Sequence, residues 1–343
     1  MQIIYHEAVQ RHDPKFFLVR GVPGQSPERP ERATLLLGAA REAGHQVLTP
    51  AAHGAGPRAA IHSPEYLDFL AGAHAAWQAL PDASPEIVAN IHPTRYPGNY
   101  PRSIVGRAGF HMADTACPLG EHSFEAACHS ADCAVEAAIR VLGGEPAVYA
   151  LCRPPGHHAF ADMAGGFCFL NNAAIAAQTL RQRCQRVAIL DVDVHHGNGT
   201  QAIFYQRADV YTLSLHADPG DYYPFFWGHA QERGEGAGEG YNLNLPLPIG
   251  TGDEDYLRAL QGLLRPLQQF APEALVVALG LDTYAGDPLR GMAISTPGFA
   301  RIGELLGALA LPTVLIQEGG YPCPELGANL VSFLRGFERA RLA

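Results

Sequence analysis

Lysine is almost absent from this chain of 343 residues: Lys15 is the only one, and charged residues of all kinds make up 17%. No basic cluster or basic–aromatic stripe is present, so we expect no nucleic-acid partner. No apolar run approaches the roughly 18 residues of a membrane span. The first residues also lack the basic leader and apolar segment of a signal peptide. We therefore expect a cytoplasmic protein with no membrane partner.

Paired cysteines are also missing. The seven cysteines are an odd number and none forms a C-x-x-C pair, which indicates free thiols in a reducing compartment. Hydrophobic residues make up 47%, which excludes disorder as the main state. The net charge of -10 weakly favours cationic ligands. The sixteen histidines are the unusual feature, since many of them lie beside Asp, Gly and Pro.

Short apolar runs alternate with Ala- and Leu-rich stretches along the chain. This pattern predicts one α/β domain over residues 1–343, a mostly parallel sheet with helices on both faces. The predicted strands are Gln2–Tyr5, Ala147–Leu151, Val187–Leu190, Val210–Leu215, Tyr241–Leu245, Leu275–Leu279 and Thr313–Gln317. The predicted helices are Pro30–Ala43, Pro64–Leu80, Phe124–Leu142, Ala173–Gln182, Thr200–Gln206, Asp253–Phe270, Pro297–Leu309 and Pro324–Glu338. Only Pro81–Pro118 lacks a clear period, and so long a segment is usually functional or an interface element.

Five polar segments follow five of the predicted strands. In open α/β sheets, ligands bind outside the carboxyl ends of the strands, so these segments should meet at one edge. They are Arg153–His158, Asp191–Gly199, Ser214–His216, Gly280–Asp282 and Glu318–Tyr321.

The segment after the second of these strands contains Asp191, Asp193 and His195 at alternate positions. Alternate residues of an extended chain share a face, so two carboxylates and an imidazole can surround one cation. This donor set suits zinc or another borderline divalent metal. The competing interpretation is a capped turn in which the carboxylates accept backbone N–H bonds. Asp282, at another strand end, is the natural third ligand, which leaves an open position for water or substrate.

Such a centre needs a separate general base, since two carboxylates leave the ion nearly neutral and less able to acidify water. His157 and His158 are the candidates, although they could be two surface loop histidines. Asp191, if it is not a ligand, could hold one of them as a cation. Neutral Asn198 could hold the other at a lower pKa, where it accepts a proton near neutrality.

The Glu318–Tyr321 segment provides a possible electrophile. Its paired glycines allow the backbone to approach a ligand closely, and the Tyr321 phenol can donate to a developing oxyanion. A packed aromatic is the alternative for Tyr321. Gly165–Phe167 and Tyr222–Pro224 are either core or the walls of a narrow apolar channel.

Taken in order, these motifs resemble the histone deacetylase superfamily. The matching segments are Arg153–His158, Gly166–Asn171, Asp191–Gly199, Ser214–His216, Gly286–Pro288 and Glu318–Tyr321. The insertion before residue 120 and the asparagine at 198 resemble the bacterial acetylpolyamine amidohydrolase branch. The resemblance implies an arginase–deacetylase fold and zinc-dependent hydrolysis of the acetyl amide of small cationic amines, such as acetylputrescine and acetylcadaverine.

The resemblance also implies a role for each matching residue. Asp193, His195 and Asp282 would bind one catalytic Zn²⁺, or Fe²⁺ natively. His158 would be the general base and then the general acid, His157 with Asp191 an electrostatic partner, and Tyr321 the group that polarises the acetyl carbonyl. Gly166, Phe167, Tyr223 and Leu289 would line the substrate tunnel. A structural K⁺ would lie by Asp191, Asp193, His195, Ser214 and Leu215. Residues 81–118 would narrow the entrance across a homodimer.

The insertion departs from that branch in one respect. Enzymes of the branch carry acidic residues there that meet the distal ammonium, whereas no Asp or Glu lies between Glu86 and Asp114, and position 105 is valine. Asp114 is left for such a contact. Three alternatives therefore stay open: a protein or peptide acyl-lysine deacetylase, a two-metal ureohydrolase-type enzyme, and a non-catalytic protein that binds acylated amines.

Overall fold

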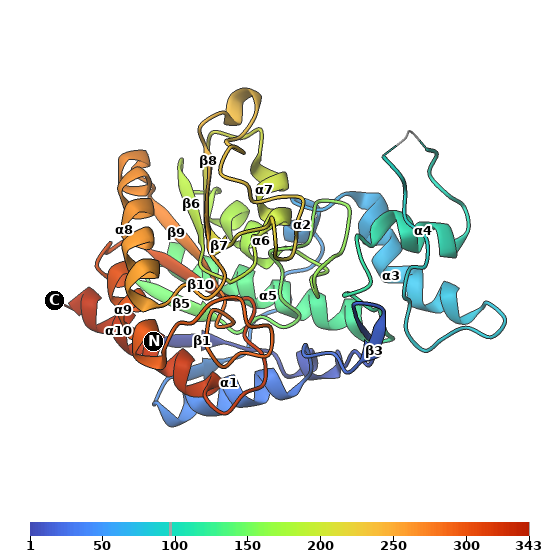
Figure 1. The fold of residues 1–343 in the computed structure, drawn as a ribbon, viewed down its shortest axis with the longest axis horizontal. Helices are drawn as coiled ribbons and strands as arrows, with labels where there is room; N and C mark the ends of the chain where they lie inside the picture. Colours follow the sequence, from blue (N-terminus) through green and yellow to red (C-terminus); the bar gives the residue numbers. More distant parts are fainter. Residues whose placement is uncertain (96–97, 343) are drawn as a thin grey trace.

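A computed structural model describes residues 1–95 and 98–342. Its centre is an eight-stranded sheet in the order β4-β1-β5-β10-β9-β6-β7-β8, in which every pairing is parallel (Figure 1). The predicted single α/β fold is confirmed. The strands of this sheet are β1 (Gln2–Ile4), β4 (Gln46–Leu48), β5 (Ala147–Ala150), β6 (Val187–Asp191), β7 (Val210–Ala217), β8 (Asn242–Leu247), β9 (Ala274–Leu279) and β10 (Thr313–Gln317).

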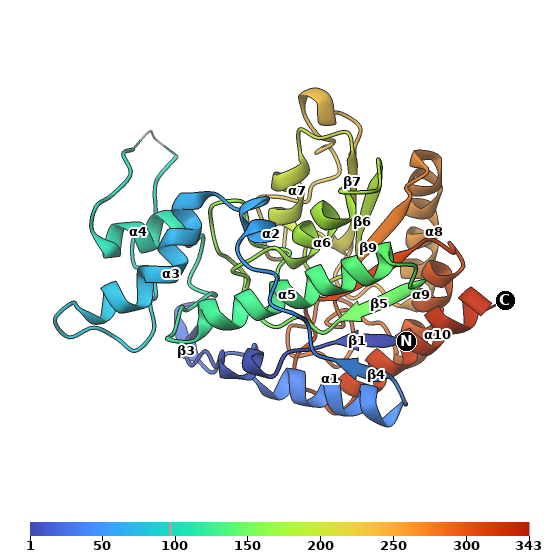
Figure 2. The same ribbon diagram turned by 180° about the vertical axis from the view of Figure 1, so that it is seen from behind.

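Helices cover both faces of the sheet because successive side chains of each strand point to opposite sides. Val148 and Val314 pack in one apolar core with α5 and α6, whereas Tyr149 and Leu315 pack in a second core with α1, α8, α9 and α10. Figure 2 shows α5 in front of the sheet. The covering helices are α1 (Glu31–Glu42), α5 (Ser123–Leu142), α6 (Asn172–Leu180), α8 (Asp253–Phe270), α9 (Thr296–Gly307) and α10 (Leu326–Leu342).

Every strand and helix predicted from the sequence is present. The predicted ends lie within two residues of the observed ones, except that α10 runs four residues further, to Leu342. Ser63 caps α3 (Pro64–Gln78) by accepting a hydrogen bond from the Tyr66 amide. The predicted helix after Asp191–Gly199 is α7 (Asn198–Phe204).

Several short elements were not predicted. A two-stranded hairpin is formed by β2 (Phe17–Val19) and β3 (Val22–Gly24), and α2 (Gly56–Ala59) is a single turn. Two 3-10 helices, Glu7–Arg11 and Gly236–Gly238, were not predicted either. Like β4, the hairpin strands have three residues each, too few for a period to appear in the sequence.

The segment Pro81–Pro118 has more structure than its composition indicates. It contains α4 (Ile104–His111), capped by Ser103, and a bridge between Ile87 and Leu119 closes its base. Residues 96 and 97 of this segment lie outside the described residues. Figures 1 and 2 show α4 beside α3, at the end of the molecule far from α8.

Among the described residues, no helix is both long enough and apolar enough to span a lipid bilayer. All seven cysteines lie within the described ranges, and all are free thiols, as the sequence predicts.

Candidate active site

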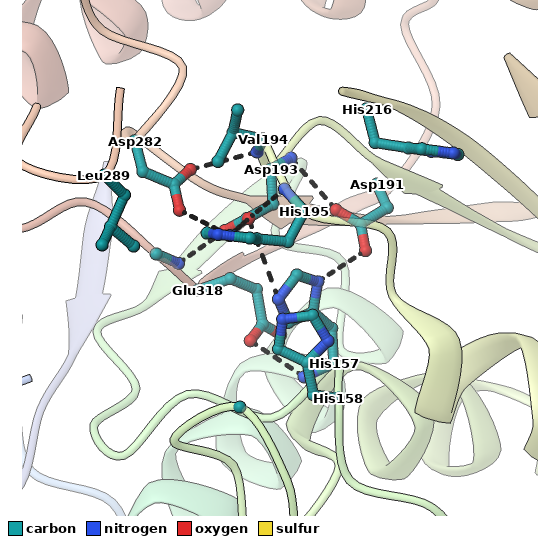
Figure 3. Close-up of polar contacts among 12 residues, drawn as sticks. His157, His158, Asp191, Asp193, Val194, His195, His216, Asp282, Leu289 and Glu318 are labelled. Carbon is teal, nitrogen blue, oxygen red and sulfur yellow. Dashed lines mark hydrogen bonds and ion pairs between the residues drawn. The ribbon is translucent and has the colours of Figure 1, made fainter. Parts of the chain in front are cut away.

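The predicted polar segments meet at the carboxyl edge of the sheet. Strands β5, β6, β9 and β10 are neighbours in it, and His157, Asp193, Asp282 and Glu318 lie in the loops that follow them. Figure 3 shows these side chains directed toward one another from separate loops. Residues up to 161 positions apart in sequence thus form one polar cluster beneath the surface.

Asp193, His195 and Asp282 offer one ligand atom each, and these atoms all lie within 4.8 Å of one another. Nδ1 of His195 lies 3.1 Å from Oδ1 of Asp193 and 3.2 Å from Oδ2 of Asp282. All three residues are buried. Apart from this contact with His195, Oδ2 of Asp282 accepts no hydrogen bond from the described residues, although a buried carboxylate oxygen that lacks a hydrogen bond is costly. The donor set and this oxygen fit a divalent metal ion.

Gly319 closes the other side of this cluster. Its amide donates to Oδ2 of Asp193 over 2.7 Å. A Cβ atom at this position would lie 2.1 Å from Oδ2 of Asp282 and 2.6 Å from Oδ2 of Asp193. Only glycine therefore lets the backbone approach the two carboxylates without displacing them.

Asp191 points away from the other two carboxylates, toward His157 (Figure 3). Its Oδ2 lies 2.9 Å from Nδ1 of His157, and its Oδ1 accepts from the Asp193 amide. Burial lowers the pKa of His157, but the charges of Asp191 and Asp193 outweigh it and raise that pKa to about 10. His157 is therefore held as a cation.

His158 has the opposite environment. Its Nδ1 lies 2.7 Å from Oδ1 of Asn198, a neutral carbonyl that fixes the proton on Nδ1 and leaves Nε2 free to accept. Burial, and next the neighbouring cation of His157, hold the pKa of His158 well below its ordinary value. The two adjacent histidines thus have different charges because their partners differ.

A cavity of about 410 Å³ opens onto this cluster and is lined by His158, His195 and Tyr321. The residues predicted for the substrate tunnel all line it as well: Gly166, Phe167, Tyr223 and Leu289. The Tyr223 ring meets the His158 ring edge to face at 4.9 Å, and Phe167 meets Tyr321 at 5.6 Å. At Gly166, where φ is +52°, a Cβ atom would lie 2.4 Å from Cδ2 of His158. The cavity is therefore lined by aromatic rings together with polar groups of the cluster.

The residues predicted to hold K⁺ are also brought together. Ser214 and Asp191 are register partners in the parallel pair β6–β7, and Leu215 follows on β7. The Ser214 hydroxyl lies 2.7 Å from Nδ1 of His216, and both residues are buried.

Three acidic residues support the site, and the sequence predicted no role for any of them. Glu318 accepts the amides of Gly156 and His157 on Oε2, and burial raises its pKa to about 7. Asp287 accepts the amides of Leu289 and Tyr321. Both lie within segments that the sequence marks, but nothing local to them indicates these contacts.

The third acid, Glu28, is fully buried before α1. It binds Arg32 at 2.7 Å and Arg153 at 2.9 Å. Arg32 in turn donates to the carbonyls of Glu318 and Gly320 and lies 4.8 Å over the Tyr321 ring. A buried charge network therefore supports the Tyr321 turn from beneath.

Comparison with known proteins gives matches over nearly the whole chain. The model of the histone deacetylase domain matches residues 26–337. An acetylpolyamine amidohydrolase of Burkholderia pseudomallei is 48% identical over 342 residues, covering 99% of this chain and all of the relative. One from Mycoplana ramosa is 39% identical, with 98% and 99% covered. A crystal structure of acetylpolyamine aminohydrolase from B. pseudomallei superimposes with a TM-score of 0.97 at 48% identity, over 99% of both chains.

Proposed function

The chain belongs to the histone deacetylase family, and from this premise we propose that it hydrolyses the acetyl amide of small cationic amines, such as acetylputrescine and acetylcadaverine. The relatives named as acetylpolyamine amidohydrolases support this substrate class. The observation that carries the proposal is that His158, His195 and Tyr321 all line the same cavity.

In this proposal, Asp193, His195 and Asp282 hold one catalytic Zn²⁺, with Fe²⁺ as the native alternative. When bound, such an ion acts as a Lewis acid toward the amide carbonyl and toward water. The two aspartates and neutral imidazole leave little net charge, so the protein's own base remains necessary.

His158 supplies that base. With its proton fixed on Nδ1 by Asn198, Nε2 takes a proton from the attacking water and later returns it to the leaving amine. Cationic His157, paired with Asp191, stabilises negative charge that develops nearby. The Tyr321 hydroxyl donates to the oxyanion, and Asp287 and Arg32 hold the turn that carries it.

The surroundings of the site belong to the same proposal. Residues 1–343 act as one deacetylase domain, a K⁺ ion lies by Asp191, Asp193, His195, Ser214 and Leu215, and the insertion at 81–118 narrows the entrance in a homodimer. In this proposal the aromatic walls that include Phe167 and Tyr223 favour an unbranched aliphatic amine over a bulky peptide.

The test is acetate release from acetylputrescine, spermidine acetylated at one end and an acetyl-lysine peptide, measured with zinc-loaded protein. We expect turnover of the small amines, its loss on chelation and its return with zinc. The Asp282→Asn variant, analysed for bound zinc, is the matched control for the site. Exclusive turnover of the peptide would make the chain a protein deacetylase. Binding without acetate release would make it a non-catalytic binding protein, and two catalytic ions per chain would favour the ureohydrolase-type enzyme.

A further inference from the structure

The outer part of the catalytic cavity carries charges of both signs. Besides the histidines, Arg20, Asp114 and Asp221 line it. A long substrate with its acetyl end near His158 shares this cavity with these three side chains. Their availability therefore decides which distal groups the cavity accepts.

The carboxylate of Asp114 is already engaged by the protein. It accepts from the Tyr223 hydroxyl over 2.7 Å, from the Gly166 amide over 3.2 Å and from the Ala116 amide over 2.8 Å. These bonds tie the insertion to both walls of the cavity. Asp114 thus stabilises the tunnel walls, and its carboxylate already accepts three hydrogen bonds from the protein.

Arg20 and Asp221 are in the opposite situation. Both are exposed, and neither side chain has a hydrogen bond or ion pair with any residue in the described ranges 1–95 and 98–342. A guanidinium and a carboxylate without protein partners therefore line one cavity and are free to meet a ligand.

The backbone at Arg20 gives a second, independent observation. Val19 pairs with Val22, so Arg20 and Gly21 form a two-residue hairpin turn, with φ of +51° and +81°. Two positive φ values are typical of a type I′ turn, where Asn and Gly are the favoured residues. An arginine at this position is conformationally unfavourable, and such strain points to a use for its side chain.

The hairpin is also held over the cavity rather than left loose. Phe17 on β2 packs on Phe167 of the tunnel wall at 5.5 Å, and residues 17–20 all line the cavity. The turn therefore presents Arg20 at a fixed place on the rim, with Asp221 on the loop that also carries Tyr222 and Tyr223.

We propose that Arg20 and Asp221 form a two-point receptor for a distal end that bears a carboxylate and an ammonium together, so that the substrates include free amino acids acetylated on the side-chain amine. A simple diamine gains from Asp221 but is repelled by Arg20. Only a zwitterionic end gains from both charges, since the guanidinium pairs with carboxylates and the aspartate with ammonium groups. This inference rests on the proposed function and names a further substrate class for the same site.

Three acetylated compounds with the same five-carbon chain separate the two charges. Acetylcadaverine has only the distal ammonium, 6-acetamidohexanoate only the carboxylate, and Nε-acetyl-lysine both. The Arg20→Asn variant removes the guanidinium while placing a favoured residue in the turn, so the hairpin is retained. Asp221→Asn removes the other charge, and Arg183→Asn, an exposed arginine on the turn after α6, is the control for net charge.

For Arg20→Asn we expect kcat/KM to fall about fivefold on Nε-acetyl-lysine and 6-acetamidohexanoate and to rise on acetylcadaverine, mostly through KM. Asp221→Asn should lower it about as much on Nε-acetyl-lysine and acetylcadaverine but not on 6-acetamidohexanoate. These effects should shrink with added salt, and Arg183→Asn should change none of them. Equal effects of Arg20→Asn on all three compounds, or no effect, would overturn the receptor.

Failure of the proposed function gives a different result. If zinc-loaded wild-type protein releases acetate from none of the compounds, the hydrolase assignment fails, and calorimetric binding of the same three compounds to wild type and both variants then decides the inference. Binding of Nε-acetyl-lysine that is weakened by either substitution supports the receptor. An affinity for Nε-acetyl-lysine that neither substitution changes, or no binding at all, refutes it.

Discussion

Tyr321 shows how a single side chain depends on distant residues. Its backbone amide donates to Asp287, and its ring packs against Phe167. The Arg32 guanidinium lies over the ring, 4.8 Å from the ring centroid. Burial raises the pKa of the phenol well above its ordinary value, so it stays protonated and able to donate. Fixed orientation and a retained proton are what an oxyanion donor requires.

We therefore predict that Tyr321→Phe lowers kcat on acetylputrescine about a hundredfold or more, while the ring contacts and the melting temperature are preserved. Steady-state kinetics and thermal unfolding check both parts. Tyr241→Phe is the matched control, since Tyr241 lies just before β8 and does not line the cavity. Wild-type turnover in Tyr321→Phe would remove the phenol from the mechanism.

His157 and His158 differ in charge because a different oxygen atom faces Nδ1 of each ring. His157 faces a carboxylate and His158 faces the amide oxygen of Asn198. The residues alone indicated that Asp191 and Asn198 each hold one histidine but left open which one. The family resemblance assigned His157 to Asp191, and the structure has this contact. Adjacent residues on one loop can point to either, and only the fold decides.

Asn198→Asp should make the environment of His158 resemble that of His157. A carboxylate at Nδ1 raises the pKa of His158 by favouring its cation, so a base that must be neutral becomes active only at higher pH. We expect the acidic limb of the kcat/KM profile to move up by about one to three pH units. An unmoved limb would assign the base to another group.

At the scale of elements, the sequence predicted helices and strands that are long enough for a hydrophobic period to appear. The strand Thr313–Gln317 and the helix Asp253–Phe270 were predicted to the residue. The hairpin of β2 and β3 was not, since its strands have three residues and its turn carries Arg20 where Asn would have been a signal. The same unfavourable residue that hid the hairpin is the one that suggests a function for it.

The contacts between the start of α1 and the active-site loops could not be predicted from the sequence either. Glu28 meets Arg153 across 125 positions, and no local pattern indicates that the acid is buried. Its two arginines also bind the carbonyls of Val9, His12, Glu318 and Gly320, so this carboxylate is the shared counter-ion where four segments meet.

Removing that charge should be costly. Glu28→Gln leaves two buried guanidinium groups without a counter-ion, and we predict a loss of about 3–5 kcal/mol in the free energy of unfolding. Urea denaturation measures it. Glu31→Gln is the matched control, because that residue is exposed and its one ion pair within residues 1–95 and 98–342 is with Arg29, so its change should stay below about 1 kcal/mol. Similar small losses in both variants would contradict the network.

At the scale of the whole molecule, the site could be predicted because parallel strands bring their carboxyl ends to one edge. The convergence of Asp193, His195 and Asp282 follows from strand order, even though 87 positions separate His195 from Asp282. What strand order cannot supply is the outer part of the cavity. That part comes from the hairpin, the insertion and the loop of Tyr223, whose mutual contacts depend on side-chain fit.

Buried histidines outside the site make the free energy of unfolding depend on pH. His12 beside Glu28 and His62 beneath α6 are both buried, and burial lowers the pKa of each to about 4. In the unfolded chain each titrates near 6.5. Between these values the unfolded state binds more protons, so the free energy of unfolding falls as pH decreases from about 6.5 to about 4 and is then unaffected by these groups.

Each histidine contributes up to about 3 kcal/mol to this loss, from roughly 2.5 pH units at 1.36 kcal/mol each. His62 gives the cleaner test, since its Nε2 accepts from the Asn171 amide while Nδ1 has no partner among the described residues. In His62→Gln the side-chain oxygen can accept the same bond without titrating. The difference between the wild-type and variant profiles, from urea denaturation across this range, cancels the contributions of other groups, including the buried carboxyls of the site. We expect that difference to shrink by about 3 kcal/mol between pH 6.5 and pH 4, whereas parallel profiles would show that His62 titrates alike in both states.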